Sequence, residues 1–328
     1  EYFKGDTINW TQIEMTSPDL NGGARGLYAG GTTPSAATAR IGYVTIPTLG
    51  SAVDAGDLTV ARYQMGACSS RTRAVITLGE VPGSPGINNT IDYVTISSTG
   101  NAVDFGDLTV ARFQMGACSS RTRAVVTLGE VAASPGINNT IDYVEISSTG
   151  NAIDFGDDTT QNMQTSACSN QTRGLIQGGY GFNTVTYITI ATTGNPVDFG
   201  DLTGRIDRSS AFASSTRGVR LGGRDNTSTY QNTIDFTIIS TTGNYTDFGD
   251  LSTAAADGSA CSNSTRGIYF SGYGGSYTNV IEYITIATTG NAVDFGDQLA
   301  NKAYGSAASS HTRAVNMGGF DSPTATNV

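Results

Sequence analysis

The sequence predicts an all-β chain that folds as a seven-bladed β-propeller with four antiparallel strands in each blade. Three observations lead to this fold class: one motif occurs seven times, its period is close to fifty residues, and each period contains four short β-prone segments. A lone four-stranded sheet of this kind cannot bury both of its faces, whereas a closed ring of such sheets can. We therefore expect a single propeller domain over residues 1–328.

The repeat is anchored by a Gly-Asp pair within the motif DFGDLT. Two of the units, residues 51–100 and 101–150, differ at only a few positions, such as Ala55 against Phe105, which indicates a recent duplication. The anchors lie 51, 50, 50, 44, 49 and 47 residues apart, at Gly5, Gly56, Gly106, Gly156, Gly200, Gly249 and Gly296.

The stretch 111–157 illustrates the four strands expected in every unit. Its segment TIDYVEIS carries apolar side chains at both alternations, with Ile141 and Tyr143 on one and Val144 and Ile146 on the other. This is typical of strands that are buried on both faces, and nowhere does a helical period persist for about ten residues. The predicted strands are 111–120, 122–130, 140–147 and 152–157, with a Gly/Pro/Asn loop at 131–139 and a turn at 148–151.

The composition fits a folded chain and argues against two classes of partner. With 38% hydrophobic residues, 42 Gly and only 8 Pro, the chain can bury a core. No apolar run approaches the roughly 18 residues of a membrane span, so we expect no membrane insertion. A net charge of −10, with only Lys4 and Lys302 as lysines, argues against nucleic acid, because binding phosphates requires a basic surface.

The two ends of the sequence fall inside units. The chain begins with EYFKGD, late in one unit, and ends with SPTATNV, just before a third strand. We therefore expect it to be part of a longer chain, and we expect an upstream or partner segment to supply the outer strands of the seventh blade.

The order of motifs resembles the kelch repeat, in which the second strand ends in a Gly pair and the third carries a Tyr. The run TRGIYFSGYGG, followed by NVIEYITIATTGN and AVDFGDQL, carries this resemblance over essentially the whole chain. Similar Gly pairs are Gly30-Gly31, Gly178-Gly179, Gly222-Gly223 and Gly318-Gly319.

The sequence departs from the kelch repeat at several places. Two units have Gly-Glu, at Gly79-Glu80 and Gly129-Glu130, in place of the Gly pair. The turn AVDFGDLT also resembles a degenerate Asp-box of sialidase-type propellers, without its leading Ser. Phenylalanine stands where kelch repeats have Trp, at Phe105, Phe155, Phe199, Phe248 and Phe295.

A narrower resemblance joins the motifs EYITIATTGN, VDFGDL, ACSS and TRG. Together they are similar to the tandem repeats in virion and fibre proteins of marine tailed phages, especially those that infect cyanobacteria. The resemblance implies a structural role on a particle, with other virion proteins as partners and a host-surface glycan or protein as ligand.

Charged residues recur in register along the repeat. An Asp and an Arg separated by 16 residues occur in six units, while Asp6 and Arg25 are separated by 19. We interpret them as structural ion pairs that are buried or half-buried, and the alternative is a ring of guanidinium groups that binds anions around the channel. The pairs are Asp57 and Arg73, Asp107 and Arg123, Asp157 and Arg173, Asp201 and Arg217, Asp250 and Arg266, and Asp297 and Arg313.

The four cysteines share one phase of the repeat, within the motif ACS. Other units place Ala there, as at Ala213 and Ala308. Equivalent positions on neighbouring blades should lie farther apart than the about 7 Å between Cα atoms that a disulfide tolerates. We expect Cys68, Cys118, Cys168 and Cys261 to be small, buried, reduced residues of the innermost strand.

Neither a metal nor another cofactor is expected. His311 is the one histidine, so the copper site of some kelch-type oxidases has no imidazoles to build it. The two carboxylates of VDFGD lack the further oxygen ligands that calcium requires.

Catalytic residues are not expected either. A glycosidase needs two carboxylates across a cleft, whereas the acids here stay in register around the ring. A Ser-His pair is conceivable only at His311, inside the Ser-rich segment SAASSHTR. We therefore predict a chain that is not an enzyme.

The loops after the second strands vary most from unit to unit, and loops on a rigid scaffold carry recognition. Several present aromatic rings in Gly-rich settings, suited to stacking on a sugar. The alternative is that these rings cover blade edges. The candidates for ligand binding are Tyr180, Phe182, Tyr230, Tyr273 and Tyr277.

The expected function is a non-enzymatic structural and binding module of a phage particle, either a tail fibre component or a virion decoration. Its expected location is the virion, an extracellular particle. A cellular kelch-type adaptor for protein interaction is the first alternative, and a carbohydrate-active enzyme is the second.

Overall fold

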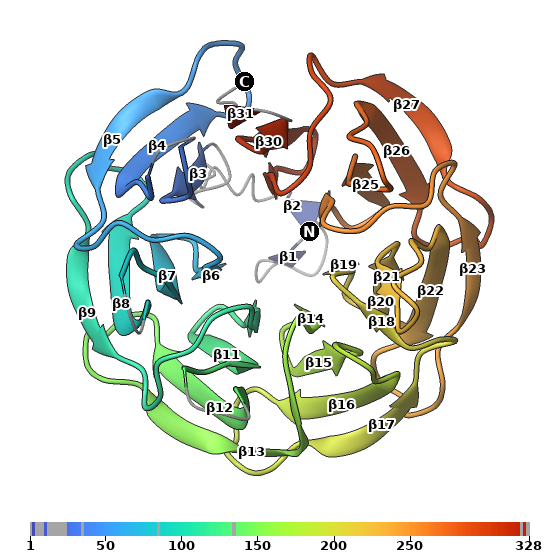
Figure 1. Cartoon of the computed structure of the whole chain (residues 1–328), viewed down its shortest axis with the longest axis horizontal. Helices are drawn as coiled ribbons and strands as arrows, with labels where there is room; N and C mark the ends of the chain where they lie inside the picture. The colour runs from blue at the N-terminus through green and yellow to red at the C-terminus, as the bar shows by residue number, and fades with distance from the viewer. Residues whose placement is uncertain are drawn as a thin grey trace.

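The computed structural model describes residues 25–33, 36–83, 86–132, 136–321 and 324–325, together with strands β1 (Tyr2–Phe3) and β2 (Trp10–Thr11). Twisted sheets stand around a common axis and the colours run once around the ring (Figure 1). All pairings between strands are antiparallel in the described part of the chain, and none of its segments is helical. The prediction of an all-β propeller is confirmed.

Five blades are complete four-stranded sheets, and in each the strands run from the innermost to the outermost in chain order. The first two are β6 (Gly66–Ser69), β7 (Arg73–Glu80), β8 (Ile87–Thr95) and β9 (Val103–Asp107), then β10 (Gly116–Ser119), β11 (Arg123–Glu130), β12 (Ile137–Glu145) and β13 (Ile153–Asn162). The next is β14 (Ser166–Ser169), β15 (Arg173–Gln177), β16 (Thr184–Thr189) and β17 (Val197–Asp201). The last two are β19 (Ser210–Ala213), β20 (Arg217–Leu221), β22 (Thr233–Ile238) and β23 (Thr246–Asp250), then β24 (Ser259–Ser262), β25 (Arg266–Phe270), β26 (Val280–Thr285) and β27 (Val293–Asp297).

A sixth blade has three strands, and the remaining sheets have two. The three-stranded blade is β3 (Arg25–Ala29), β4 (Arg40–Thr45) and β5 (Val53–Asp57). The two-stranded sheets pair β1 with β2, β18 (Ile206–Asp207) with β21 (Arg224–Asp225), β28 (Ser306–Ser309) with β29 (Ala314–Met317), and β30 (Phe320–Asp321) with β31 (Thr324–Ala325).

The prediction of seven four-stranded blades is wrong in its count, because the described residues form six blades. The seventh unit contributes the two-stranded sheets β28–β29 and β30–β31 in place of a four-stranded blade, and β28 lies between β24 and β3. Arg313, at the end of the turn after β28, donates a hydrogen bond to the carbonyl oxygen of Ile46 at 3.3 Å and so joins the last unit to the first blade. The predicted anchor Gly5 lies outside the described residues.

Strand bounds differ from the prediction where the backbone turns left-handed. The inner strand predicted at 111–120 is only β10, because Gln114 has φ 54° and interrupts the extended chain. Leu128, at φ 51°, puts a bulge into β11. In both closely similar units Leu78-Gly79 and Leu128-Gly129 thus take the left-handed backbone that Gly178-Gly179 takes in a later unit, one residue earlier than the Gly-Glu pairs.

The core lies between neighbouring blades. One cluster joins Val75, Ile91 and Phe105 of one blade to Val126 and Val144 of the next. On β12 both alternations are buried, as the sequence predicted, with Ile141 fully buried on one and Val144 4% exposed on the other. A blade therefore gains a complete core only from both of its neighbours.

The DFGD motif locks the outer strand of each blade to the next blade. Gly100 donates its N–H to the carbonyl of Ala55 at 2.6 Å, and the amide N–H of Asp57 donates to Asn101 Oδ1 at 3.1 Å. Gly56 has φ 135°, and a Cβ there would overlap the backbone of Gly100. The motif is therefore repeated for a backbone contact that requires Gly.

The antiparallel order gives the inner part of the ring two distinct faces. Turns such as 70–72 and 170–172, which join the first and second strands of a blade, lie on one face, which we name the turn face. The loops between second and third strands, and the links that enter each first strand, lie on the other, which we name the loop face.

Candidate functional site

The repeated arginines tie each blade to the next one, and the predicted Asp–Arg pairs do not form among the described residues. Arg123 stacks on the ring of Tyr143, with Cζ 4.4 Å from the ring centroid. It also donates to the carbonyl of Ile190 in the next blade at 3.1 Å and to Glu145 at 2.6 Å. The aspartate ends the outermost strand of one blade while the arginine begins the second strand of the following blade, so 16 residues of spacing do not bring them together.

The same arrangement recurs around the ring. Five further arginines stack on an aromatic ring of the neighbouring strand of the same sheet: Arg25, Arg73, Arg173, Arg217 and Arg266. Donation to the carbonyl of an isoleucine in the following blade recurs at Arg25, Arg73, Arg173, Arg217 and Arg313. The predicted ion pairs are therefore wrong for all six aspartates, because none of them pairs with an arginine in the described chain. They are Asp57, Asp107, Asp157, Asp201, Asp250 and Asp297.

The cysteines confirm the prediction of buried thiols on the innermost strands. All four, Cys68, Cys118, Cys168 and Cys261, are free and buried. Burial raises the pKa of the Cys68 and Cys168 thiols to about 12 and that of Cys261 to about 11. Phe212, one residue before the predicted Ala213, is their equivalent in β19, because it pairs with Val219 as Cys168 pairs with Leu175.

Three fully buried ion pairs escaped the sequence prediction, and two of them lie in the closely similar blades β6–β9 and β10–β13. Arg62 contacts Asp92 at 2.8 Å and Arg112 contacts Asp142 at 3.0 Å, and all four side chains are fully buried. The hydroxyl of Thr109 donates to the Asp142 carboxylate at 2.7 Å. The signal was the polar Asp inside an otherwise apolar third strand. These pairs lack solvent access, so they are structural.

The loop face carries a ring of left-handed residues around the inner edge of the propeller. One such residue precedes each first strand, and the six φ values fall between 53° and 60°. Backbone hydrogen bonds connect the last five of them in order, for example from Arg208 N–H to the Gln164 carbonyl at 3.3 Å and from Asp257 N–H to the Arg208 carbonyl at 3.1 Å. The members of this inner loop-face ring are Gln64, Gln114, Gln164, Arg208, Asp257 and Tyr304.

The side chains of this ring differ although the backbone repeats. On one half, Gln164 donates to Gln114 Oε1 at 2.9 Å. On the other half, Arg208 and Asp257 form an ion pair at 3.6 Å, and Tyr304 hydrogen-bonds to the same carboxylate. Left-handed non-Gly residues are uncommon and concentrate at functional sites, so the divergent half marks a candidate site.

Desolvation shapes the charges of this half. Burial raises the pKa of Asp257, and Arg208, Tyr304 and Arg224 lower it only in part. Burial, then the charge of Asp257 and its hydrogen bond, raise the pKa of Tyr304 to about 12. The site therefore holds a carboxylate that the protein solvates poorly, next to a phenol that stays protonated at neutral pH.

Aromatic rings from neighbouring loops gather beside these charges. The ring centroids of Tyr230 and Tyr273 lie 5.6 Å apart, those of Tyr273 and Tyr277 5.0 Å, and those of Tyr277 and Phe320 6.0 Å. The structure thus brings together three of the five predicted aromatics. Tyr180 and Phe182 belong to the preceding blade and are 57% and 36% exposed.

Phe320 and the charged residues were missed by the sequence prediction. Phe320 follows the Gly pair of the last unit, as Tyr180 follows Gly178-Gly179, and this position was the available signal. Arg224, which forms a β-bridge with Tyr230 and an ion pair with Asp207 at 3.3 Å, connects the rings to the charges. We name Arg208, Arg224, Asp257, Tyr304, Tyr230, Tyr273, Tyr277 and Phe320 the aromatic–charged patch.

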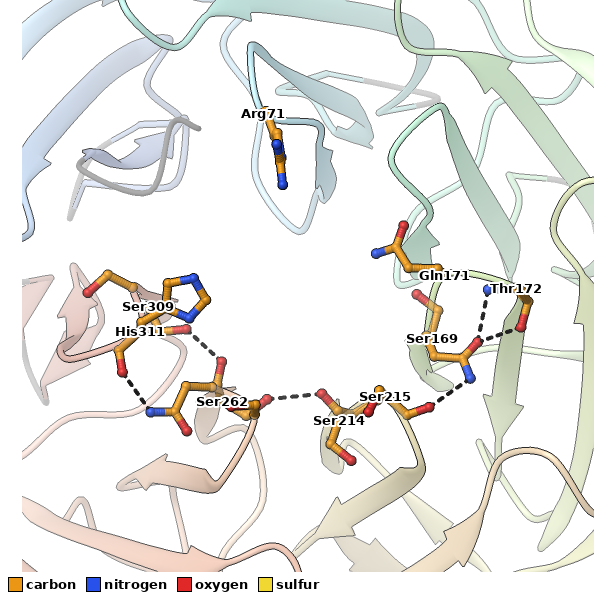
Figure 2. A pocket seen from close by; sticks show the side chains of 14 residues that line it. Arg71, Ser169, Gln171, Thr172, Ser214, Ser215, Ser262, Ser309 and His311 are labelled. Atoms are coloured by element: carbon orange, nitrogen blue, oxygen red, sulfur yellow. Dashed lines mark hydrogen bonds between the residues drawn. The ribbon is translucent and has the colours of Figure 1, made fainter. Parts of the chain in front are cut away.

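The turn face holds a separate cavity of about 580 Å³ (Figure 2). Turns from five units contribute to it, with Arg71, Gln171 and His311 around the opening and several serines along the wall. It lies at the opposite ends of the innermost strands from the inner loop-face ring.

The described residues hold neither a metal-binding cluster nor a membrane-spanning helix. No group of three or more His, Cys, Asp or Glu side chains there has an arrangement suited to a metal ion. In the same residues there is no helix of the length and apolarity needed to cross a membrane.

Comparisons with known proteins give the fold. No family model matches the chain, and no curated protein matches it. The chain is similar to a solved structure described as that of YjhT, with a TM-score of 0.64 at 10% sequence identity, over 82% of this chain and 94% of that chain. The chain is a β-propeller. At this identity the likeness carries no more than the fold.

Proposed function

We propose that the chain is a non-enzymatic binding module of the kelch-like type, that the aromatic–charged patch is its ligand surface, and that its ligand is carbohydrate. One observation carries this proposal. The inner loop-face ring repeats its backbone in six units, yet its side chains change from Gln to Arg, Asp and Tyr on the half that also gathers the aromatic rings.

The change is not needed for the fold. Gln64 and Gln114 occupy the same backbone conformation as Asp257 and Tyr304, so this conformation does not require a charge. Placing a partly desolvated carboxylate at Asp257 costs stability, because burial disfavours its charged form. A group that costs stability and sits at a rim is better explained by ligand binding than by folding.

The chemistry of the patch suits a sugar. Tyr230, Tyr273, Tyr277 and Phe320 are each half-buried, so the protein holds their rings while part of each ring remains open. A pyranose ring stacks on such a face, and its hydroxyls both donate and accept hydrogen bonds. Arg208 and Arg224 supply donors and Asp257 supplies an acceptor.

A place on a phage particle follows from the resemblance of the repeats to virion and fibre proteins. Single contacts of this kind are weak, and display of many copies on a particle would convert them into useful avidity. Other virion proteins are the proposed structural partners. Mass spectrometry of purified virions tests this placement, and absence of the chain from them would favour a cellular adaptor.

The ligand proposal is tested on a glycan array with a multimerised form of the chain. We expect a signal that Tyr273→Ala abolishes and Tyr230→Ala reduces. Tyr63→Ala is the matched control, because Tyr63 lies on the loop face but outside the patch, where its hydroxyl bonds to Glu80. A signal that all three variants retain would overturn the patch, and cleavage of the bound glycan would favour a carbohydrate-active enzyme.

A further inference from the structure

The cavity of the turn face has a stiff wall. Ser169 donates its hydroxyl hydrogen to the Ser119 carbonyl at 2.9 Å, and Ser309 donates to the Ser262 carbonyl at 2.9 Å. The amide of Asn263 donates to the His311 carbonyl at 2.8 Å in the next unit. These hydrogen bonds connect one turn to the next and hold the outline of the cavity, and Figure 2 draws the last two of them.

The side chains at the rim of the cavity differ from those of the wall, because their hydrogen-bond donors are not used by other protein groups among the described residues. Each comes from the tip of one turn, and none has a protein partner for its side chain in the described part of the chain. Figure 2 shows Arg71, Gln171 and His311 around the same opening. The rim residues are Arg71, Gln171, Ser215, Ser264 and His311.

The charge of the cavity is opposite to that of the chain. The protein has a net charge of −10, yet none of the described lining residues is Asp or Glu. Arg71 supplies a permanent positive charge, and Gln171 and His311 supply N–H donors. A concave site with several donors, one guanidinium and no carboxylate selects for oxygen atoms that carry negative charge.

We propose that this cavity binds a small ligand through an oxyanion, a carboxylate, sulfate or phosphate, held by Arg71 with Gln171 and His311 as further donors. The serine oxygens of the wall, whose hydrogens are already used, accept hydrogen bonds from the hydroxyls of a ligand that carries them. The volume of about 580 Å³ accommodates a group of the size of one sugar acid. This site is independent of the patch on the loop face.

The repeat provides a matched control. Arg121 stands at the tip of the next turn, in the segment CSSRTRAVVTL, as Arg71 does in CSSRTRAVITL. Both arginines are exposed, but only Arg71 lines the cavity. A cavity site therefore predicts different effects of the two substitutions, whereas diffuse attraction to a positive rim predicts equal effects.

Isothermal titration calorimetry with inorganic sulfate, inorganic phosphate and glucuronate, each against chloride at constant ionic strength, tests the proposal. We expect saturable binding of at least one of them, weakened at least about fivefold by Arg71→Ala and changed less than about twofold by Arg121→Ala. Binding of glucuronate alone identifies a sugar acid, and binding of the inorganic ions identifies a free anion; either supports the oxyanion site.

Three outcomes overturn the site. They are no saturable binding of any probe, equal weakening by Arg71→Ala and Arg121→Ala, and loss of binding in Tyr273→Ala, which changes only the opposite face. Both arginines are exposed, so unchanged melting temperatures of their variants confirm that the fold is intact. Since Tyr273→Ala is expected to leave oxyanion binding unchanged, failure of the glycan proposal does not affect this test.

Discussion

The blades β6–β9 and β10–β13 differ from the blades β19–β23 and β24–β27 in where they place their charges. The first two bury an arginine from the link before the inner strand against an aspartate of the third strand, as in Arg112 and Asp142. In β19–β23 the arginine comes from the second strand instead, where Arg220 pairs with Asp235, and in β24–β27 Glu282 accepts from the backbone N–H of Ser252 at 2.8 Å.

This difference shows that a buried acid in the third strand must be satisfied, but that it does not require one particular partner. Each of these blades buries an acid in the third strand and satisfies it, but the partner changes from blade to blade. When the partner of the buried acid no longer comes from the link before the innermost strand, the sequence of that link can vary. In the last two blades the link places Arg208 and Asp257 on the rim of the loop face. The core therefore keeps its polar balance while the rim diverges.

Removing one member of a buried pair is the largest expected perturbation. Arg112→Met leaves the carboxylate of Asp142 buried and uncompensated, which is expected to cost about 3 to 5 kcal/mol of unfolding free energy. The exposed pair Arg40 and Asp54, whose side chains are both 60% exposed, is the control, and Arg40→Met should cost less than about 1 kcal/mol. Urea denaturation measures both.

The double variant Arg112→Met with Asp142→Leu sharpens this comparison. It replaces both charges by apolar groups, and we expect it to recover most of the loss, because a buried pair contributes little net stability. A double variant as unstable as Arg112→Met alone would mean that the packing of Arg112, and not its charge, is what the blade needs.

Breaking the contact between blades is the second largest expected effect. Arg123→Ala loses the stacking on Tyr143 and the hydrogen bonds to Ile190 and Glu145, at an expected cost of about 2 to 3 kcal/mol. Asp107→Ala is the control and should change stability by less than about 0.5 kcal/mol, since Asp107 has no ion pair among the described residues. Equal losses in the two thermal melts would restore the ion pair that the sequence suggested.

The fold class followed from the sequence because a period near fifty with apolar residues at both alternations leaves few alternatives to stacked sheets. The partners of the charged residues could not be predicted from the sequence. A constant spacing between two residues does not say which strands carry them or whether their side chains meet. The Asp and Arg of this motif keep a spacing of 16 residues in six units, and yet Asp107 and Arg123 lie on different blades.

The candidate site was predictable only in part. The aromatic loops stood out by composition, so Tyr230, Tyr273 and Tyr277 were found. Arg208, Asp257 and Tyr304 were not, because their shared left-handed backbone becomes visible only once the links are superimposed, and no common residue type marks it.

Changing the size of one side chain at the contact between two blades is expected to have a smaller effect on stability. Phe212 on β19 packs against Gly267 of the next blade, and a Cβ at Gly267 would overlap its ring. At the same two positions earlier in the ring stand Cys68 and Ala124, which pack in one cluster. Gly267→Ala is expected to cost about 1 to 2 kcal/mol through overpacking.

Restoring the earlier combination tests the reason for that loss. The double variant Phe212→Cys with Gly267→Ala reproduces the pair Cys68 and Ala124, and we expect it to be more stable than Phe212→Cys alone, which leaves a cavity. If Gly267→Ala costs the same in both backgrounds, its effect does not come from the ring of Phe212. Thermal melts of the four proteins give the coupling energy.

The smallest expected effect distinguishes the two halves of the inner loop-face ring. Burial raises the pKa of Asp257 above its unfolded value, so this group favours folding when protonated, and that contribution is lost as the pH rises through the folded pKa. We expect Asp257→Asn to melt at a higher temperature than the parent at pH 7, and we expect the gap to shrink as the pH falls and the folded-state carboxyl takes up a proton before an ordinary carboxyl does. A gap that stays constant as the pH falls would contradict the raised pKa. If Asp257→Asn is more stable than the parent and has lost the signal on the glycan array, the ligand needs the carboxylate and the fold does not. This result would explain why the rim keeps a carboxylate that folding disfavours.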